Sequence, residues 1–99
     1  MDRLEEVLAD LAAEGEVLDA LVAPLDEAAW RTPTPAAGWE VATQVAHLAW
    51  TDEATVAAVR AGQEWERLAV AAAADTGALV DGAAHAGAAV PPSQLLERW

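Results

Sequence analysis

Apolar residues recur every three or four positions along the first part of the chain, as they do on one face of an amphipathic helix. Acidic residues fall mostly off this stripe, so that one face is apolar and the other is charged. Pro24 lacks a backbone N–H and is predicted to end or kink the helix, and residues 26–30 are predicted to add a short further turn. The stripe consists of Leu4, Leu8, Leu11, Gly15, Leu18, Val22 and Leu25.

A loop and a second helix follow. Residues 31–38 contain two prolines and a glycine, a composition that favours a loop. Helical spacing then resumes and predicts a helix over about residues 40–61, with Gly62 as its C-terminal cap. The apolar positions of this helix are Val41, Val45, Leu48, Val56 and Val59.

The pattern is weaker between Gln63 and Val90, where the larger apolar residues are embedded in alanine. Three glycines in this stretch would each cost about 1 kcal/mol relative to alanine in a helix. Their five-residue spacing matches neither a helix face nor a strand, so we interpret the stretch as an Ala/Gly-rich connecting region rather than a functional repeat. Residues 91–99 resemble the start of another helix, with proline tolerated in the first turn and Ser93 able to cap it.

This last segment carries the apolar residues Leu95, Leu96 and Trp99 in a very short helix. A helix of fewer than about 12 residues is marginal unless it packs against something. We therefore expect residues 1–99 to form a single helical domain that is the N-terminal portion of a larger one, or that finds its missing half in another chain.

Composition supports an all-α fold, with 55% hydrophobic residues, much alanine and no Tyr or Phe. The formal net charge of −12 would repel a phosphate backbone, so we expect no nucleic-acid partner and no binding to an anionic membrane. The N-terminus lacks the basic and then apolar order of a signal peptide, and the longest apolar run, residues 68–74, is too short to span a bilayer. These features predict a cytoplasmic protein.

The best candidate for chemistry is His47, which lies inside the apolar second helix. Its neighbours one helical turn away include no second histidine or carboxylate. The pattern alone favours a hydrogen-bonded core histidine and leaves a metal ligand as the alternative. Because cysteine is absent, any zinc site must use histidine and carboxylates.

No other residue acquires a chemical role from the pattern. His85 is interpreted as solvent-facing, and the adjacent carboxylate pairs as solvated surface. No serine or cysteine nucleophile can be assembled with a histidine base, so the catalytic and cofactor-binding residues stay unassigned. The tryptophans are interpreted as bulky core residues of an Ala-rich bundle: Trp30, Trp39, Trp50, Trp65 and Trp99.

The Thr- and Pro-rich loop, then Gly38 and Trp39, then residues 45–48 with His47, resembles the first metal-ligand segment of a known family. These are the DinB-like helical bundles of the mycothiol-dependent maleylpyruvate isomerase type. The amphipathic first helix, residues 49–54 and residues 91–99 look most like an uncharacterised actinobacterial branch. The resemblance covers nearly all of the chain but only the front part of the family's domain.

The resemblance implies a four-helix bundle, here an incomplete one of about three helices plus the start of another. It implies that His47 is the first ligand of a divalent metal, zinc or nickel. The family's other ligands are a Glu or His followed four residues on by a His, and we expect that motif to lie beyond Trp99. One copy of this chain is accordingly expected to hold no stable metal and to lack activity.

For a complete member, the resemblance implies a metal-dependent thiol transferase or isomerase that acts with a low-molecular-weight thiol such as mycothiol. A second hypothesis comes from the apolar stripes alone. It describes a non-enzymatic acidic helical module that self-associates, for example as a homodimer, or binds a partner helix.

Overall fold

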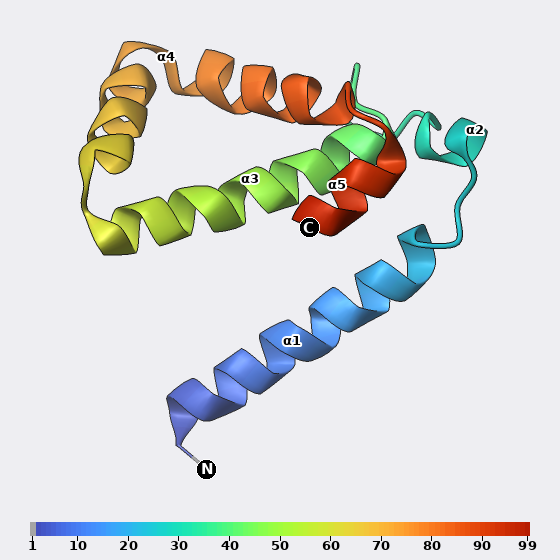
Figure 1. The fold of residues 1–99 in the computed structure, drawn as a ribbon, viewed down its shortest axis with the longest axis horizontal. Coiled ribbons are helices and arrows are strands. Elements are labelled where there is room, and N and C mark those ends of the chain that lie inside the picture. The colour runs from blue at the N-terminus through green and yellow to red at the C-terminus, as the bar shows by residue number, and fades with distance from the viewer. Residues whose placement is uncertain (1) are drawn as a thin grey trace.

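The computed structural model describes residues 2–99 and is all-α, as the sequence predicts. Three long helices and two short ones succeed one another (Figure 1). Within the described residues no strand forms, apart from an isolated bridge between Pro33 and Glu40 in the loop. The helices are α1 (Arg3–Val22), α2 (Glu27–Trp30), α3 (Val41–Arg60), α4 (Gln63–Ala88) and α5 (Pro92–Arg98).

The first two helices begin at acidic caps. The Asp2 carboxylate accepts a hydrogen bond from the Glu5 N–H, and the Glu5 carboxylate accepts one from the Asp2 N–H. Helix α1 ends at Val22, shortly before Pro24, as predicted. Asp26 then caps α2, which is the short further turn expected from the sequence.

Helix α3 spans the predicted range to within one residue at each end, but its cap differs from the prediction. Ala61, with φ 51° and ψ 35°, is the left-handed residue that ends the helix, and its N–H bonds to the carbonyls of Ala57 and Ala58. Gly62 is extended and precedes α4 as its N-cap residue. The prediction that Gly62 caps α3 was wrong because the chain turns one residue earlier.

The stretch that we interpreted as an Ala/Gly-rich connecting region forms helix α4. It runs from Gln63 to Ala88 and is interrupted at Asp75, where φ is −164° and ψ is 96°. The Asp75 carboxylate accepts a hydrogen bond from the Ala78 N–H at 3.0 Å and so caps the second half of the helix. Alanine is the best helix former, and this explains why the stretch is helical despite its glycines.

Helix α5 begins one residue before the predicted cap. Pro91 is the N-cap residue and Pro92 occupies the first turn, where a missing N–H costs nothing. The side chain of Ser93 makes no capping hydrogen bond, so the prediction that it caps the helix was wrong.

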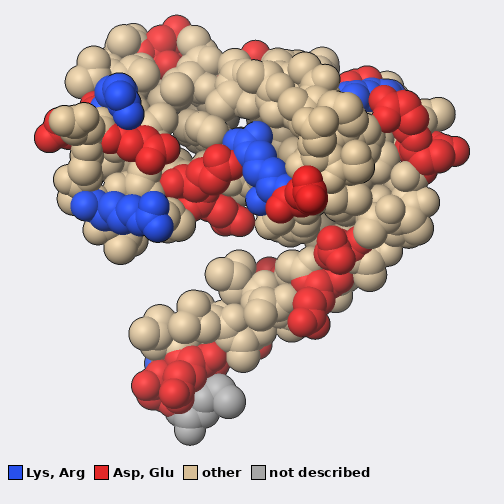
Figure 2. Space-filling view, viewed as in Figure 1, with Lys and Arg blue, Asp and Glu red and all other residues tan. Residues whose placement is uncertain are grey.

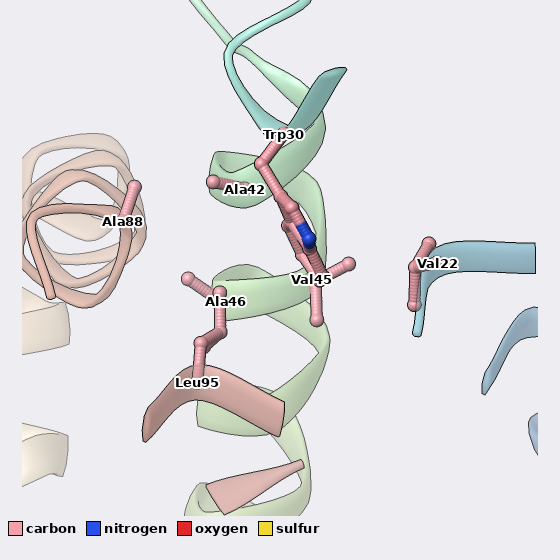
Figure 3. Close-up of a cluster of buried hydrophobic side chains, with 7 residues drawn as sticks. All are labelled: Val22, Trp30, Ala42, Val45, Ala46, Ala88 and Leu95. Atoms are coloured by element: carbon pink, nitrogen blue, oxygen red, sulfur yellow. The ribbon is translucent and has the colours of Figure 1, made fainter. Parts of the chain in front are cut away.

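The core is built from small residues around two larger side chains, Trp30 and Leu95 (Figure 3). Trp30 is 1% exposed, but Trp65 is 39% exposed and the remaining tryptophans are half-buried. The interpretation of the tryptophans as core residues is therefore confirmed for Trp30, and the partly buried Trp99 packs against the core cluster. The buried cluster comprises Val22, Trp30, Ala42, Val45, Ala46, Ala88 and Leu95.

Helix α4 turns at its kink and returns alongside α3 towards α5, whereas α1 projects away from this body (Figure 1). Near its C-terminal end, Val22 belongs to the core cluster and Leu18 packs against it. The large apolar residues on the rest of α1 are 50–66% exposed. No helix within residues 2–99 is long and apolar enough to cross a membrane.

Candidate functional site

His47 lies in the N-terminal half of α3 and is half-buried. Its Nδ1 is buried and has no hydrogen-bond partner among residues 2–99. The pattern favoured a hydrogen-bonded core histidine, and the structure shows instead an imidazole with one nitrogen unpaired. A buried nitrogen without a partner is uncommon, because it loses its hydrogen bond to water and gains none in return.

The polar neighbours of His47 on its own helix are engaged elsewhere. The Thr43 hydroxyl accepts a hydrogen bond from the Glu40 N–H at 3.1 Å. The Gln44 amide donates to the Thr34 hydroxyl at 3.2 Å. Both side chains therefore fix the loop that leads into α3.

That loop presents Trp39 to His47. The centroids of the two rings lie 5.3 Å apart with an interplanar angle of 59°. The Trp39 carbonyl accepts hydrogen bonds from the Thr34 N–H at 2.8 Å and from the Thr34 hydroxyl at 2.9 Å. Gly38, with φ 77°, allows the tight turn just before the tryptophan.

Helix α4 contributes two further residues to this site. The indole Nε1–H of Trp39 donates to the Asp81 carboxylate at 2.8 Å. His85 lies one turn along, with its Nε2 3.4 Å from Asp81 Oδ1 and its ring edge-on to Trp39 at 6.3 Å. The sequence assigned neither residue a role, although the spacing of four residues places Asp81 and His85 on one face of a helix.

The second half of α4 can approach α3 closely because Gly87 has no side chain. A Cβ at this position would lie 2.7 Å from the Ala46 Cβ, well inside normal contact. Arg31 also ties the loop to the end of α4, since its Nη1 donates to the Ala88 carbonyl at 2.6 Å. Asp81 and His85, on the same half of the helix, thereby reach Trp39.

Residues 2–99 bring together no group of three histidine, cysteine, aspartate or glutamate side chains suited to a metal ion. His47 offers one unpaired nitrogen, the buried Nδ1. Its unpaired Nδ1 fits a role as a ligand or as a donor to a group outside these residues. Protein zinc sites need three or four ligands, so the side chains present form part of a site.

Two clefts border α3 beyond His47, and its neighbours Leu48 and Ala49 line them. One is about 300 Å³ and includes Glu53 and Arg98, which form an ion pair. The other is a groove of about 380 Å³ between α1 and α3, lined by residues such as Leu11, Leu18 and Leu48. His47 lines neither cleft.

Comparison with known families agrees with the resemblance of the His47 segment. The sequence model of the mycothiol maleylpyruvate isomerase N-terminal domain matches residues 11–99. The chain therefore belongs to this family of helical domains.

Two curated relatives extend the comparison, both described as uncharacterised proteins of Mycobacterium tuberculosis, from two strains. Each is 48% identical to this chain over 92 residues. The match covers 93% of this chain and 36% of each relative, so the chain spans about a third of their length. No solved structure matches the chain significantly.

Proposed function

We propose that this chain is the N-terminal part of a divalent-metal-binding protein related to mycothiol-dependent isomerases and thiol transferases. In this proposal His47 supplies one ligand to zinc or nickel, and the remaining ligands come from outside residues 2–99. The observation that carries the proposal is the buried, unpaired Nδ1 of His47 in a member of this family.

The local structure supports this role for His47. A metal-ligating imidazole is usually held in a fixed orientation by its surroundings. Here Trp39 packs against the ring, and Asp81 on α4 holds Trp39. Thr34 and Gln44 in turn fix the loop that carries this tryptophan.

A divalent ion with an open coordination position makes a bound thiol or water easier to deprotonate. This chain has no cysteine of its own. A thiol for such chemistry would therefore be a small-molecule substrate or cofactor, and mycothiol is the one suggested by the family name. The role of His47 would be to bind and orient the ion.

The coding sequence after the Trp99 codon tests where the other ligands lie. We expect a downstream helix with Glu-x-x-x-His or His-x-x-x-His. A zinc titration of the 99-residue chain complements this reading, and we expect no stoichiometric binding at micromolar zinc. Stoichiometric binding that is lost in His47→Ala would show that the site is completed in another way and would contradict the proposal.

A second candidate function is favoured by the exposed apolar residues of α1. Three leucines of its apolar stripe are each more than half exposed, and such a stripe is typical of an association surface: Leu4, Leu8 and Leu11. The same helix carries many acidic side chains, which Figure 2 shows along the projecting arm. The chain would then act as a non-enzymatic module that pairs with itself or with a partner helix.

Sedimentation velocity at several protein concentrations tests the second candidate. Self-association through α1 predicts a sedimentation coefficient that rises with concentration and no longer rises in Leu8→Glu. Gln63→Glu, which adds the same charge at an exposed position on another helix, is the matched control. A folded monomer at every concentration would rule out self-association.

A further inference from the structure

The Trp39 indole lies close to both histidines of the chain. The His47 ring on α3 has its centroid 5.3 Å from the indole centroid, and the His85 ring on α4 approaches the indole edge-on at 6.3 Å. The Asp81 carboxylate accepts the indole N–H and also lies 3.4 Å from His85 Nε2. Side chains from two helices, α3 and α4, therefore converge on the Trp39 indole.

We infer that Trp39 is a positioning residue for His47 and that Asp81 holds it in place from α4. The inference rests on the proposed function, because the imidazole that Trp39 orients is the proposed metal ligand. Trp39 and Asp81 act through His47, and neither is assigned contact with an ion.

The physical argument starts from the freedom of the imidazole. The outer torsion of a histidine side chain is broad, so the ring needs external contacts to keep one orientation. No hydrogen bond within residues 2–99 restrains Nδ1. The tilted packing of the indole against the imidazole is then the contact that limits rotation of the ring.

Trp39 can do this because it is itself fixed at both ends. Its backbone carbonyl accepts two hydrogen bonds from Thr34. Its indole N–H is bound by an ionised carboxylate, and charge-assisted hydrogen bonds of this kind are stronger than neutral ones. Loss of the Asp81 carboxylate would free the far end of the indole and leave the fold intact, because Asp81 is exposed.

His85, on α4 like Asp81, supports the same arrangement. Its Nε2 lies close enough to Asp81 Oδ1 to pair with it when the imidazole is protonated. Its ring also packs edge-on against the indole. Asp81 and His85 thus both contact, from α4, the tryptophan that lies in the loop before α3.

Proton NMR of the metal-free 99-residue chain at fixed pH tests the positioning role. The chain has only two histidines, so His85→Gln assigns the imidazole signals of both. We expect nuclear Overhauser contacts between the indole and the His47 ring, and a ring-current shift of the His47 signals. Both should be lost in Trp39→Leu and persist in Trp65→Leu, which removes an exposed tryptophan elsewhere on α4.

Asp81→Ala keeps the test decisive if Trp39→Leu fails to fold. We expect the Trp39 indole N–H signal to move and the contacts between the two rings to weaken, while α3 stays helical. His47 signals that are identical in wild type and Asp81→Ala would overturn the role of Asp81. His47 signals unchanged in a folded Trp39→Leu or Trp39→Phe would overturn the whole inference.

Zinc titration of the full gene product separates this inference from the proposed function. Loss of a group that orients a metal ligand typically weakens metal binding by about 10- to 100-fold, and we expect this for Asp81→Ala. If the ring contacts are present but His47→Ala leaves zinc binding unchanged, the proposed function fails and the positioning of the ring stands. If zinc binding requires His47 but is unaffected by Asp81→Ala and Trp39→Phe, the positioning role fails.

Discussion

Helices α1 and α3 are each 20 residues long and both carry apolar side chains at helical spacing, yet they meet the rest of the molecule differently. Helix α3 buries mainly alanines and Val45, and α4 approaches it closely where Ala46 faces Gly87. Helix α1 carries leucines, and most of them are exposed. Small residues therefore form the interface between α3 and α4. The exposed leucines lie on α1, which the other helices leave largely uncovered.

The same contrast separates the groove beside α1 from the His47 site. The groove beside α1 is lined by apolar residues such as Leu11 and Leu18. The His47 site lies where α3 and α4 pack tightly, and its polar groups are held by Trp39, Asp81 and the loop. The chemistry is therefore expected at the packed interface, and association is expected at the uncovered one.

The largest expected effect comes from deleting the central core side chain. Trp30→Ala removes a 1%-exposed indole and should lower the free energy of unfolding by about 3–5 kcal/mol. Leu11→Ala removes a 65%-exposed side chain and should change it by less than about 0.5 kcal/mol. Urea denaturation at low protein concentration measures both. A Leu11→Ala loss as large as that of Trp30→Ala would mean that α1 is covered in solution.

A smaller loss is expected where α3 and α4 touch. Gly87→Ala places a Cβ 2.7 Å from the Ala46 Cβ and should destabilise the chain by about 1–3 kcal/mol. Gly82→Ala, on the same helix half with open space around it, should stabilise the chain by up to about 1 kcal/mol. Thermal unfolding followed by circular dichroism compares the two variants. Equal effects of the same sign would argue against close packing at Gly87.

The smallest effect is local and concerns the start of α1. Asp2→Ala removes the hydrogen bond that the Asp2 carboxylate accepts from the Glu5 N–H and should weaken the first turns of α1 by about 0.5–2 kcal/mol. Because α1 packs on the body only near its end, the loss should appear as faster amide exchange in α1 and not in α3. Asp10→Ala, in mid-helix, is the control. Faster exchange in α3 as well would show that the two helices unfold as one unit.

The sequence predicted the positions of the helices better than it predicted the contacts between them. The apolar spacing and Pro24 placed the end of α1, and α3 was predicted to within one residue at each end. Residues 63–88 were interpreted as a weakly helical connecting region because their glycines weaken the pattern, whereas the structure forms a helix that is kinked at Asp75 and capped there at its second half. Local helix propensity does not show where a helix is interrupted and capped again within its length.

The candidate site was predicted only in part for a similar reason. The flanks of His47 identified the family, and the comparison with known families confirmed it. The contacts of Asp81 and His85 with Trp39 depend on the close approach of α4 to α3 at Gly87. Contacts between residues about 40 positions apart leave no periodic signal in the sequence. The spacing of these two residues was visible, but nothing in it pointed to Trp39.

The zinc content of the full gene product tests the central claim most directly. Protein purified with zinc and passed through a desalting column should retain one ion per chain, measured by atomic emission. His47→Ala should lose the metal, and Trp65→Leu, which changes an exposed residue on the first half of α4, should keep it. A His47→Ala protein that retains stoichiometric zinc, or a wild-type gene product that binds none, would contradict the account.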